Sequence, residues 1–217
     1  AGPGDVIPYP ASAKQDYWLP TGDVFTISSD GYYEIIDRVK DIYKNNRGQT
    51  VAPQGVEKKF FNCPGIRRTF LVGDGRPYNV LLIVPDPDDP MSRSLLPENL
   101  REYYHQIVMA ANADVAPYER VINFALIGRD LSAEHGELTP KGSYNRKAIE
   151  KNFKELIESL YVSNTIVIHV PGGRISIPRW FFRDLGILED DILYRDRSLV
   201  NRRTGQILPV FRLAKGS

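Results

Sequence analysis

The chain has 217 residues, 42% of them hydrophobic and 25% charged, which is a globular composition that argues against wholesale disorder. Its 28 basic and 27 acidic residues leave a net charge of +1, so we expect no nucleic-acid partner, because such proteins normally carry a clear basic excess. A single cysteine, Cys63, excludes an intrachain disulfide, and the apolar runs are too short for a transmembrane segment.

The beginning of the chain is rich in Pro and Gly and reads Ala1-Gly2-Pro3 rather than starting at Met, so we expect a piece of a longer polypeptide. Residues 1–22 have no helical period and are predicted to be loop or edge strand. No signal peptide is visible, which favours a cytoplasmic location, with peripheral attachment to a membrane as an open alternative.

A β-hairpin is predicted next, from two β-type runs, 24–27 and 32–36, joined by the turn residues Ser29-Asp30-Gly31. The polar stretch 41–50 predicts a loop, because its Asn and Gly residues tolerate positive φ. Pro53 then suits the first turn of a short helix.

The middle of the chain, from about residue 39 to residue 161, predicts a small α+β domain. Strands are expected where apolar and β-branched residues run together, and helices where apolar residues recur every three or four positions. The stretch 85–97 is expected to be a loop because of its prolines. The remaining expected elements are strands 69–72, 79–84 and 121–127 and helices 98–113 and 146–161.

The pattern of the sequence changes after residue 161. The expected elements there are strands 165–169 and 175–177, a short helix over 178–185, and a hairpin of 198–201 with 206–210. Such short strands cannot bury enough apolar surface alone, so we expect this extension to pack on the domain before it. The run Trp180-Phe181-Phe182 is interpreted as the anchor of the short helix in a core, with contact to a membrane surface as the alternative.

Several short motifs follow one another along the chain. Taken singly, each describes an ordinary turn or a hydrated strand end, so only their order and spacing carry information. They are Trp18-Leu19-Pro20-Thr21-Gly22-Asp23, Asp30-Gly31-Tyr32, Asp37-Arg38-Val39-Lys40-Asp41, Arg47-Gly48-Gln49-Thr50-Val51-Ala52-Pro53 and Glu57, and later Glu137-Leu138-Thr139-Pro140 with Arg146-Lys147.

This series resembles the carboxyl-terminal portion of an AMP-forming acyl-CoA synthetase, a member of the adenylate-forming enzyme superfamily. The wording Val51-Ala52-Pro53-Gln54 is most similar to the long-chain fatty acid–CoA ligase branch. The resemblance covers residues 1 to about 160, and we expect the chain as a whole to have an α+β fold in three parts. Residues 1–37 would be the β-rich end of the large adenylating domain, 38–160 the small mobile C-terminal domain, and 161–217 a β-rich extension of unknown role.

The resemblance implies nucleotide-binding roles for Asp23 and Arg38. Asp23 matches a carboxylate that accepts hydrogen bonds from both ribose hydroxyls. Arg38 matches a residue on the ribose or phosphate side, where a guanidinium offers a fixed fork of donors. The alternative for Arg38 is a surface ion pair with Asp37 or Asp41.

Asp37 and Lys40 match the hinge of the family, in which the small domain rotates between two half-reactions, and a hinge residue absorbs the change in φ and ψ. Arg47, Gly48 and Gln49 match the loop that enters the site for thioester formation, where Gly48 would let backbone approach the pantetheine. The alternative for this loop is an ordinary glycine turn.

The Thr139 segment departs from the family pattern. The family's catalytic lysine is expected four residues after the threonine, and that position is Ser143. Lys141 lies two residues earlier and Lys147 four residues later. We favour Lys141 in the catalytic role, because Gly142 beside it would let the loop turn inward; the other reading is that this lysine is missing.

The implied activity is that of an acid–thiol ligase, with a fatty acid as the expected carboxylic acid. ATP, with Mg²⁺, would convert the acid to acyl-AMP, which would then pass to coenzyme A or a carrier-protein thiol. The chain alone is expected to be inactive, because the phosphate loop and the acyl pocket would belong to a missing N-terminal domain of the same polypeptide. A non-catalytic interaction or regulatory module derived from such a domain is the alternative, favoured by Ser143 and by the extension.

No metal site is predicted in the chain. His105 lies on an expected helix and is expected to be exposed or half-buried. His135 and His169 have no partners at the spacing that metal ligands require.

Overall fold

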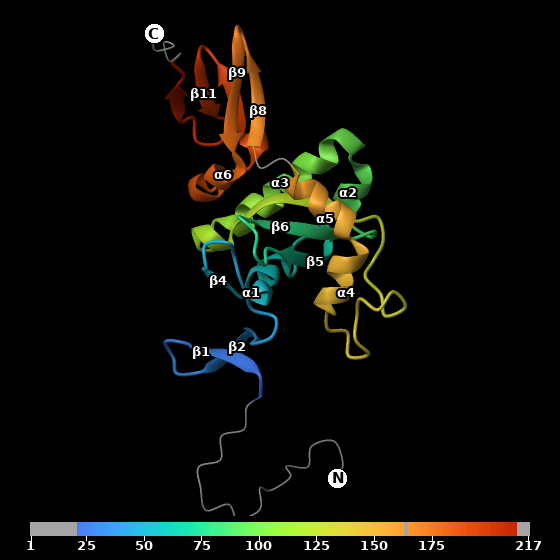
Figure 1. Ribbon diagram of the computed structural model, residues 1–217. Coiled ribbons are helices and arrows are strands. Elements are labelled where there is room, and N and C mark those ends of the chain that lie inside the picture. The colour runs from blue at the N-terminus through green and yellow to red at the C-terminus, as the bar shows by residue number, and fades with distance from the viewer. Residues whose placement is uncertain (1–20, 163–164, 212–217) are drawn as a thin grey trace, which may run out of the picture.

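A computed structural model describes residues 21–162 and 165–211 of the chain. Figure 1 shows a hairpin at one end, a central layered region, and a β-rich extension at the other end. The elements are β1 (Asp23–Ile27), β2 (Tyr33–Arg38), β3 (Tyr43–Lys44), β4 (Thr50–Val51), α1 (Pro53–Glu57), η1 (Lys58–Phe60), β5 (Ile66–Val72), β6 (Asn79–Pro85), α2 (Pro90–Ser94), α3 (Pro97–Asn112), η2 (Pro117–Glu119), β7 (Val121–Leu126), α4 (Arg146–Asn152), α5 (Lys154–Tyr161), β8 (Thr165–Val170), β9 (Gly173–Pro178), α6 (Arg179–Leu185), η3 (Glu189–Asp191), β10 (Ile192–Arg195), β11 (Ser198–Asn201) and β12 (Ile207–Pro209).

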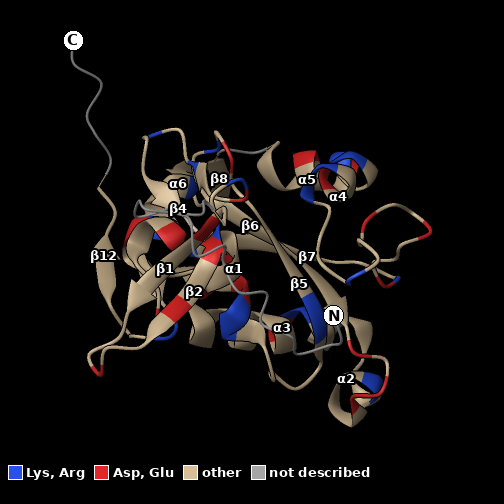
Figure 2. Ribbon diagram, turned by 90° about the horizontal axis from the view of Figure 1, so that it is seen from below, with Lys and Arg blue, Asp and Glu red and all other residues tan. Residues whose placement is uncertain are grey.

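The central sheet has the strand order β5-β6-β7. Strands β5 and β6 are antiparallel, and β6 and β7 are parallel with α3 lying between them in the chain. Neither β6 nor β7 contains a charged residue, and both are uniformly tan in Figure 2. This apolar run is what a strand covered on both faces requires.

The two faces of the sheet belong to two cores, because side chains alternate along a strand. Leu81 and Ile83 of β6 lie in the core that contains the buried residues of α1 and α3. Val80, Leu82 and Val84 lie in the core that contains residues of α4, α5 and the extension. The mixed α+β class expected from the sequence is therefore confirmed.

Helix α3 confirms the helix expected over 98–113. Pro97 occupies its first turn, where the missing N–H costs nothing. Tyr104 and Val108, one turn apart, are fully buried against the sheet.

The helix expected over 146–161 is broken into α4 and α5 at Phe153, whose φ of −104° and ψ of 18° leave the helical region. The Asn152 side chain donates to the His135 carbonyl and to the Glu137 carboxylate, each at 3.0 Å. The Arg129 guanidinium lies 4.8 Å from the centre of the Phe153 ring. These long-range contacts hold the break, and the helical period of the sequence does not show them.

Three elements occur wholly or partly where loops were expected. Strand β3 lies within the stretch 41–50 and pairs with β4, which begins at Thr50 and ends at Val51. Helix α2 interrupts 85–97: the Asp89 carboxylate accepts from Ser92 N at 2.8 Å as its N-cap, and Pro90 is in the first turn. Pro90 therefore begins a helix in a stretch where the prolines predicted a loop.

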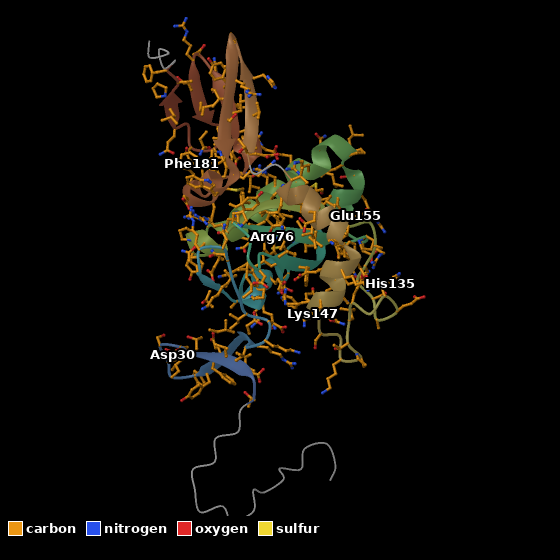
Figure 3. All side chains as sticks on the ribbon, in the orientation of Figure 1. Asp30, Arg76, His135, Lys147, Glu155 and Phe181 are labelled. Atoms are coloured by element: carbon orange, nitrogen blue, oxygen red, sulfur yellow. The ribbon has the colours of Figure 1, made fainter. Side chains whose placement is uncertain are left out.

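The extension consists of the hairpin β8–β9, helix α6 and the antiparallel sheet β10-β11-β12. Ile177, Phe182, Ile187 and Leu199 join the core on one face of the central sheet. The expected packing on the preceding domain is therefore confirmed, with Phe182 as the buried anchor. Figure 3 places the neighbouring Phe181 on the extension, far from Asp30 at the turn of the β1–β2 hairpin.

Candidate functional site

The two candidate nucleotide-binding residues, Asp23 and Arg38, lie opposite each other on the β1–β2 hairpin. Arg38 Nε is 3.7 Å from Asp23 Oδ1, and the Arg38 side chain is 55% exposed. The ion pair that the structure gives Arg38 is therefore with Asp23, and not with Asp37 or Asp41 as the alternative expected. An acceptor carboxylate and a guanidinium donor thus stand side by side, accessible from solvent.

Asp37, the candidate hinge residue, is fully buried. Its carboxylate accepts from the backbone N–H of Arg38 at 2.7 Å and of Gln54 at 2.8 Å. Gln54 is in the first turn of α1, where N–H groups have no partner inside the helix, so Asp37 ties strand β2 to α1. Lys40 follows in an exposed turn and forms no ion pair with any residue of the described ranges.

The candidate thioester-step loop is organised by Asn45, which the sequence reading treated only as a residue tolerant of positive φ. Its buried Oδ1 accepts from Arg47 N and Gln49 N, both at 3.0 Å, and its Nδ2 donates to Gln49 Oε1 at 2.9 Å. Gly48 has φ of +78°, and a Cβ there would meet no atom within 4 Å. Conformation rather than space therefore selects glycine at this position. An Asn two residues before an Arg-Gly turn is the signal that could have identified this Asx-type loop.

Glu57, from the earlier group of motifs, forms an ion pair with Arg146, from the group that follows residue 137. Arg146 Nη2 donates to Glu57 Oε2 at 2.6 Å, and the other Glu57 oxygen accepts from Leu71 N at 2.8 Å. Burial raises the pKa of the Glu57 carboxyl, and the Arg146 guanidinium opposes that rise. The Arg146 guanidinium also lies over the Phe70 ring, 4.9 Å from its centre. This pair fixes α1, β5 and α4 relative to one another.

The Thr139 segment is a tight exposed turn. Thr139 N donates to the Ser143 carbonyl and Gly142 N to the Thr139 carbonyl, each at 2.8 Å. Ser143 N donates to Thr139 Oγ1 at 3.2 Å, and Gly142 has φ of +79°. Lys141 is exposed at the tip and has no ion pair with any described residue.

The base of this turn is anchored by Glu137, which is fully buried. Its carboxylate pairs with both terminal nitrogens of Arg129, at 2.8 and 2.5 Å, and accepts from Ser132 N at 3.0 Å and from Asn152. These hydrogen bonds, with Arg129 first, lower the pKa of Glu137 to about 2. Glu137 therefore stays ionised and holds the ends of the turn.

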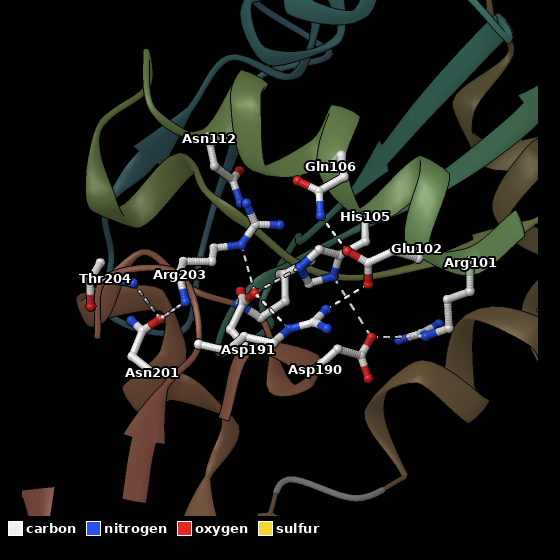
Figure 4. A network of polar contacts seen from close by, with 12 residues as sticks. Arg101, Glu102, His105, Gln106, Asn112, Asp190, Asp191, Asn201, Arg203 and Thr204 are labelled. Carbon is white, nitrogen blue, oxygen red and sulfur yellow. Dashed lines mark hydrogen bonds and ion pairs between the residues drawn. The ribbon is translucent and has the colours of Figure 1, made fainter. Parts of the chain in front are cut away.

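His105 is buried, with 1% of its surface exposed, so its expected exposed or half-buried position is wrong. His105 Nε2 lies 3.0 Å from Asp191 Oδ1, and Arg203 Nε donates to the same oxygen at 2.6 Å. Asp191 Oδ2 accepts from Leu188 N at 2.9 Å. Figure 4 shows these side chains meeting between α3 and the extension. The extension covers this face of α3, which an analysis of the helix alone cannot reveal.

The candidate residues lie in separate places on the molecule. In Figure 1 the hairpin with Asp23 and Arg38 and the loop before α4 lie toward the lower end, and the β3–β4 loop is directed toward the extension. Figure 3 places Lys147 on the same side as His135 and well away from Phe181. The structure thus brings Asp23 and Arg38 together on one hairpin, whereas Lys141 and the Arg47–Gln49 segment belong to two other loops.

The described residues support neither a metal site nor a reactive thiol. Within residues 21–162 and 165–211, no three His, Cys, Asp or Glu side chains are grouped to hold a metal ion. Cys63 is free and half-buried, and burial raises the pKa of its thiol, which disfavours the nucleophilic thiolate.

The family described as the AMP-binding enzyme C-terminal domain matches residues 40–165. The chain belongs to this family. The fadD11 protein of Mycobacterium tuberculosis, which bears the name of a fatty-acid–CoA ligase, is 30% identical over 162 residues, covering 68% of this chain and 28% of that protein. The long-chain-fatty-acid–CoA ligase FadD15 of the same organism is 28% identical over 163 residues, covering 69% of this chain and 27% of that protein.

A solved structure agrees with this membership. The adenylation domain of a carboxylate reductase from Mycobacterium chelonae superposes with a TM-score of 0.58 and 25% identity, covering 66% of this chain and 23% of that chain. This AMP-binding C-terminal domain therefore corresponds to about a quarter of the length of longer adenylate-forming enzymes. Among its described residues, no helix is both long and apolar enough to cross a membrane.

Proposed function

We propose that this domain is the C-terminal part of a ligase that activates a carboxylic acid, with a fatty acid as the expected class, and transfers it to a thiol. In this proposal ATP, with Mg²⁺, forms acyl-AMP on a large N-terminal domain. Coenzyme A or a carrier-protein thiol then receives the acyl group. The named ligase relatives support the acid class.

The observation that carries the proposal is the pairing of Asp23 with Arg38 on a strand pair next to the family domain. The Asp23 carboxylate would accept from the ribose hydroxyls, and the Arg38 guanidinium would donate on the ribose or phosphate side.

The proposal also divides the chain into three parts. Residues 1–37 would close the large domain, 38–160 would form the mobile small domain, and 161–217 would be the extension. The hairpin leaves large apolar side chains exposed, which is the surface that a covering domain would bury: Phe25, Ile27, Tyr33 and Ile35. The hinge at Asp37 and Lys40, the loop of Arg47, Gly48 and Gln49, and Lys141 as the catalytic lysine belong to this proposal.

The test is ATP–pyrophosphate exchange by a ligase that carries this domain. Asp23→Asn is expected to lower kcat/KM for ATP about 10- to 100-fold, because it weakens hydrogen bonds to a charged group. Glu34→Gln, on the exposed strand β2, serves as the matched control and should leave exchange unchanged. The 217-residue chain by itself is expected to show no exchange; turnover by that chain, or a silent Asp23→Asn, would contradict the proposal.

A non-catalytic interaction module is the second candidate. Ser143 in place of the family lysine and the solvent-exposed tip at Lys141 favour it. It predicts that Asp23→Asn leaves the activity of the longer protein unchanged.

A further inference from the structure

The extension touches the β3–β4 loop directly. The Arg47 guanidinium lies over the Trp180 ring of α6, 5.5 Å from its centre, and Trp180 is 41% exposed. This is the geometry of a cation–π contact between a loop residue and a residue about 130 positions later in the chain. The contact restrains the Arg47 side chain at the tip of a loop in which Arg47 N and Gln49 N are held by the Asn45 side chain.

Helix α6 also reaches the base of the same loop. Asn46 N donates to the Arg76 carbonyl at 3.0 Å, so the loop rests on the turn between β5 and β6. The carbonyl of the next residue, Pro77, accepts from Arg183 Nη1 at 3.1 Å, and Arg183 is buried. One short helix thus contacts the loop tip directly and the loop base through one turn.

The helix is anchored independently of Arg47. Phe182 is buried in the core shared with the central sheet. Arg120 Nη1 donates to the Arg183 carbonyl at 3.0 Å, and Gly186 ends the helix with φ of +69° where a Cβ would lie 2.8 Å from Arg120. These contacts anchor α6, so Trp180 faces Arg47 from a helix that is held without the loop.

We propose that the extension supports the Asn45–Gln49 loop and that Trp180 is a positioning residue. Trp180 acts through Arg47 on acyl transfer to the thiol. The role in transfer rests on the proposed function of this loop; the restraint of the loop does not. The loop has one conformation with Arg47 on the ring, and releasing Arg47 increases the opening of the loop.

Hydrogen exchange on the 217-residue chain tests the restraint. In Trp180→Ala, the amides of Arg47, Gly48 and Gln49 should exchange about two- to five-fold faster, the factor that a half-exposed cation–π contact supplies. Trp180→Phe keeps an aromatic face and should remain close to the wild type. Leu193→Ala, at an exposed residue of β10, is the matched control and should change nothing in the loop.

Arg47→Ala removes the same contact from the loop side and leaves α6 intact. It therefore tests the restraint of the loop even if Trp180→Ala disturbs the packing of the extension. The expected result is faster exchange of Gly48 and Gln49 with unchanged exchange in the extension. Unchanged exchange of these two amides in Arg47→Ala, or in a folded Trp180→Ala, overturns the proposal.

The two half-reactions of a ligase carrying this domain test the role in transfer. Trp180→Ala should slow acyl transfer from supplied acyl-AMP about two- to five-fold, leave ATP–pyrophosphate exchange unchanged, and be rescued by Trp180→Phe. Equal losses in both steps, or transfer that is unchanged or faster, overturn this role. A silent Asp23→Asn in the same ligase would instead contradict the proposed function, so the two failures are distinguishable.

Discussion

Glu137 is a single side chain that holds a loop in place by its charge. Burial alone would favour the neutral acid, yet the Arg129 guanidinium and two further N–H donors, from Ser132 and Asn152, keep the pKa of this carboxyl near 2. A carboxylate with a depressed pKa stabilises the fold above its unfolded-state pKa, here 4.5. That contribution is lost as the pH falls from about 5 toward 2.

Glu137→Gln is therefore expected to cost on the order of 1–2 kcal/mol at pH 7, a discounted figure because Arg129 is partly exposed and screened by water. The wild type should lose stability more steeply than the variant between pH 5 and pH 2.5, so the difference between them shrinks. Urea unfolding at these two pH values measures it. A difference that is independent of pH would show that the ion pair is not the source.

Lys141 and Ser143 allow a second test at the scale of single residues. If Lys141 supplies the positive charge beside the α-phosphate, Lys141→Ala in the longer ligase should cut adenylation roughly 10²–10³-fold, about 2–4 kcal/mol of transition-state stabilisation. Thioester formation from supplied acyl-AMP should survive. If no residue has this role, Lys141→Ala is silent and Ser143→Lys raises adenylation; Lys151→Ala, on the exposed side of α4, is the control in pyrophosphate exchange.

Among the elements, α3 is joined to the extension by a polar clasp, which consists of the side chains of His105, Asp191 and Arg203. Asp191 is fully buried and receives hydrogen bonds from Leu188 N and Arg203 and a contact from His105. Burial works to raise the pKa of Asp191, but these donors outweigh it and the pKa is lowered. Around this centre, exposed pairs continue the contact between the two elements: Arg101–Asp190 and Glu102–Arg202.

Asp191→Asn should loosen this clasp, because it removes the charge that Arg203 and His105 face inside the protein. The expected cost is about 3 kcal/mol, typical of breaking a buried charged pair. Hydrogen exchange and limited proteolysis should then report opening of β8–β12 before opening of the central sheet. Asp196→Asn, in the exposed turn after β10, is the control, and equal protection of the extension in both variants would refute the clasp.

At the scale of the whole molecule, the β2–α1 junction decides how the hairpin and the domain are oriented. Asp37 lies within the β1–β2 ladder, opposite Val24, and its carboxylate also accepts from Gln54 N in the first turn of α1. A rotation of the domain about Asp37 must therefore either break the hydrogen bond from Gln54 N or move α1 together with Asp37. This adds a physical cost to the hinge proposed at Asp37.

Asp37→Pro in the longer ligase should fix φ near −65° and trap one orientation of the domain, so one half-reaction should fall much more than the other. Asp37→Asn keeps an acceptor for Gln54 N and a flexible φ, and it should retain both. Adenylation and thioester transfer are measured separately. Equal losses in Asp37→Pro would argue that the pivot lies elsewhere.

Much of this architecture could be predicted from the sequence because its causes are local. The β1–β2 hairpin follows from turn residues between two β-type runs, and α3 follows from a helical apolar period that begins at Pro97. The order of the motifs indicated the family, because several chemically specific residues at set spacings do not recur by chance. Gly48 and Gly142 were recognised as turn positions because only glycine adopts positive φ without strain.

The tertiary structure decided what depends on partners distant in the chain. His105 is buried only because the extension covers α3, and the break at Phe153 depends on contacts to residues before α4. The meeting of Arg47 with Trp180 joins a loop to an extension more than a hundred residues later. No local periodicity encodes such pairs, because their free energy arises only when the intervening sheet has brought the two segments together.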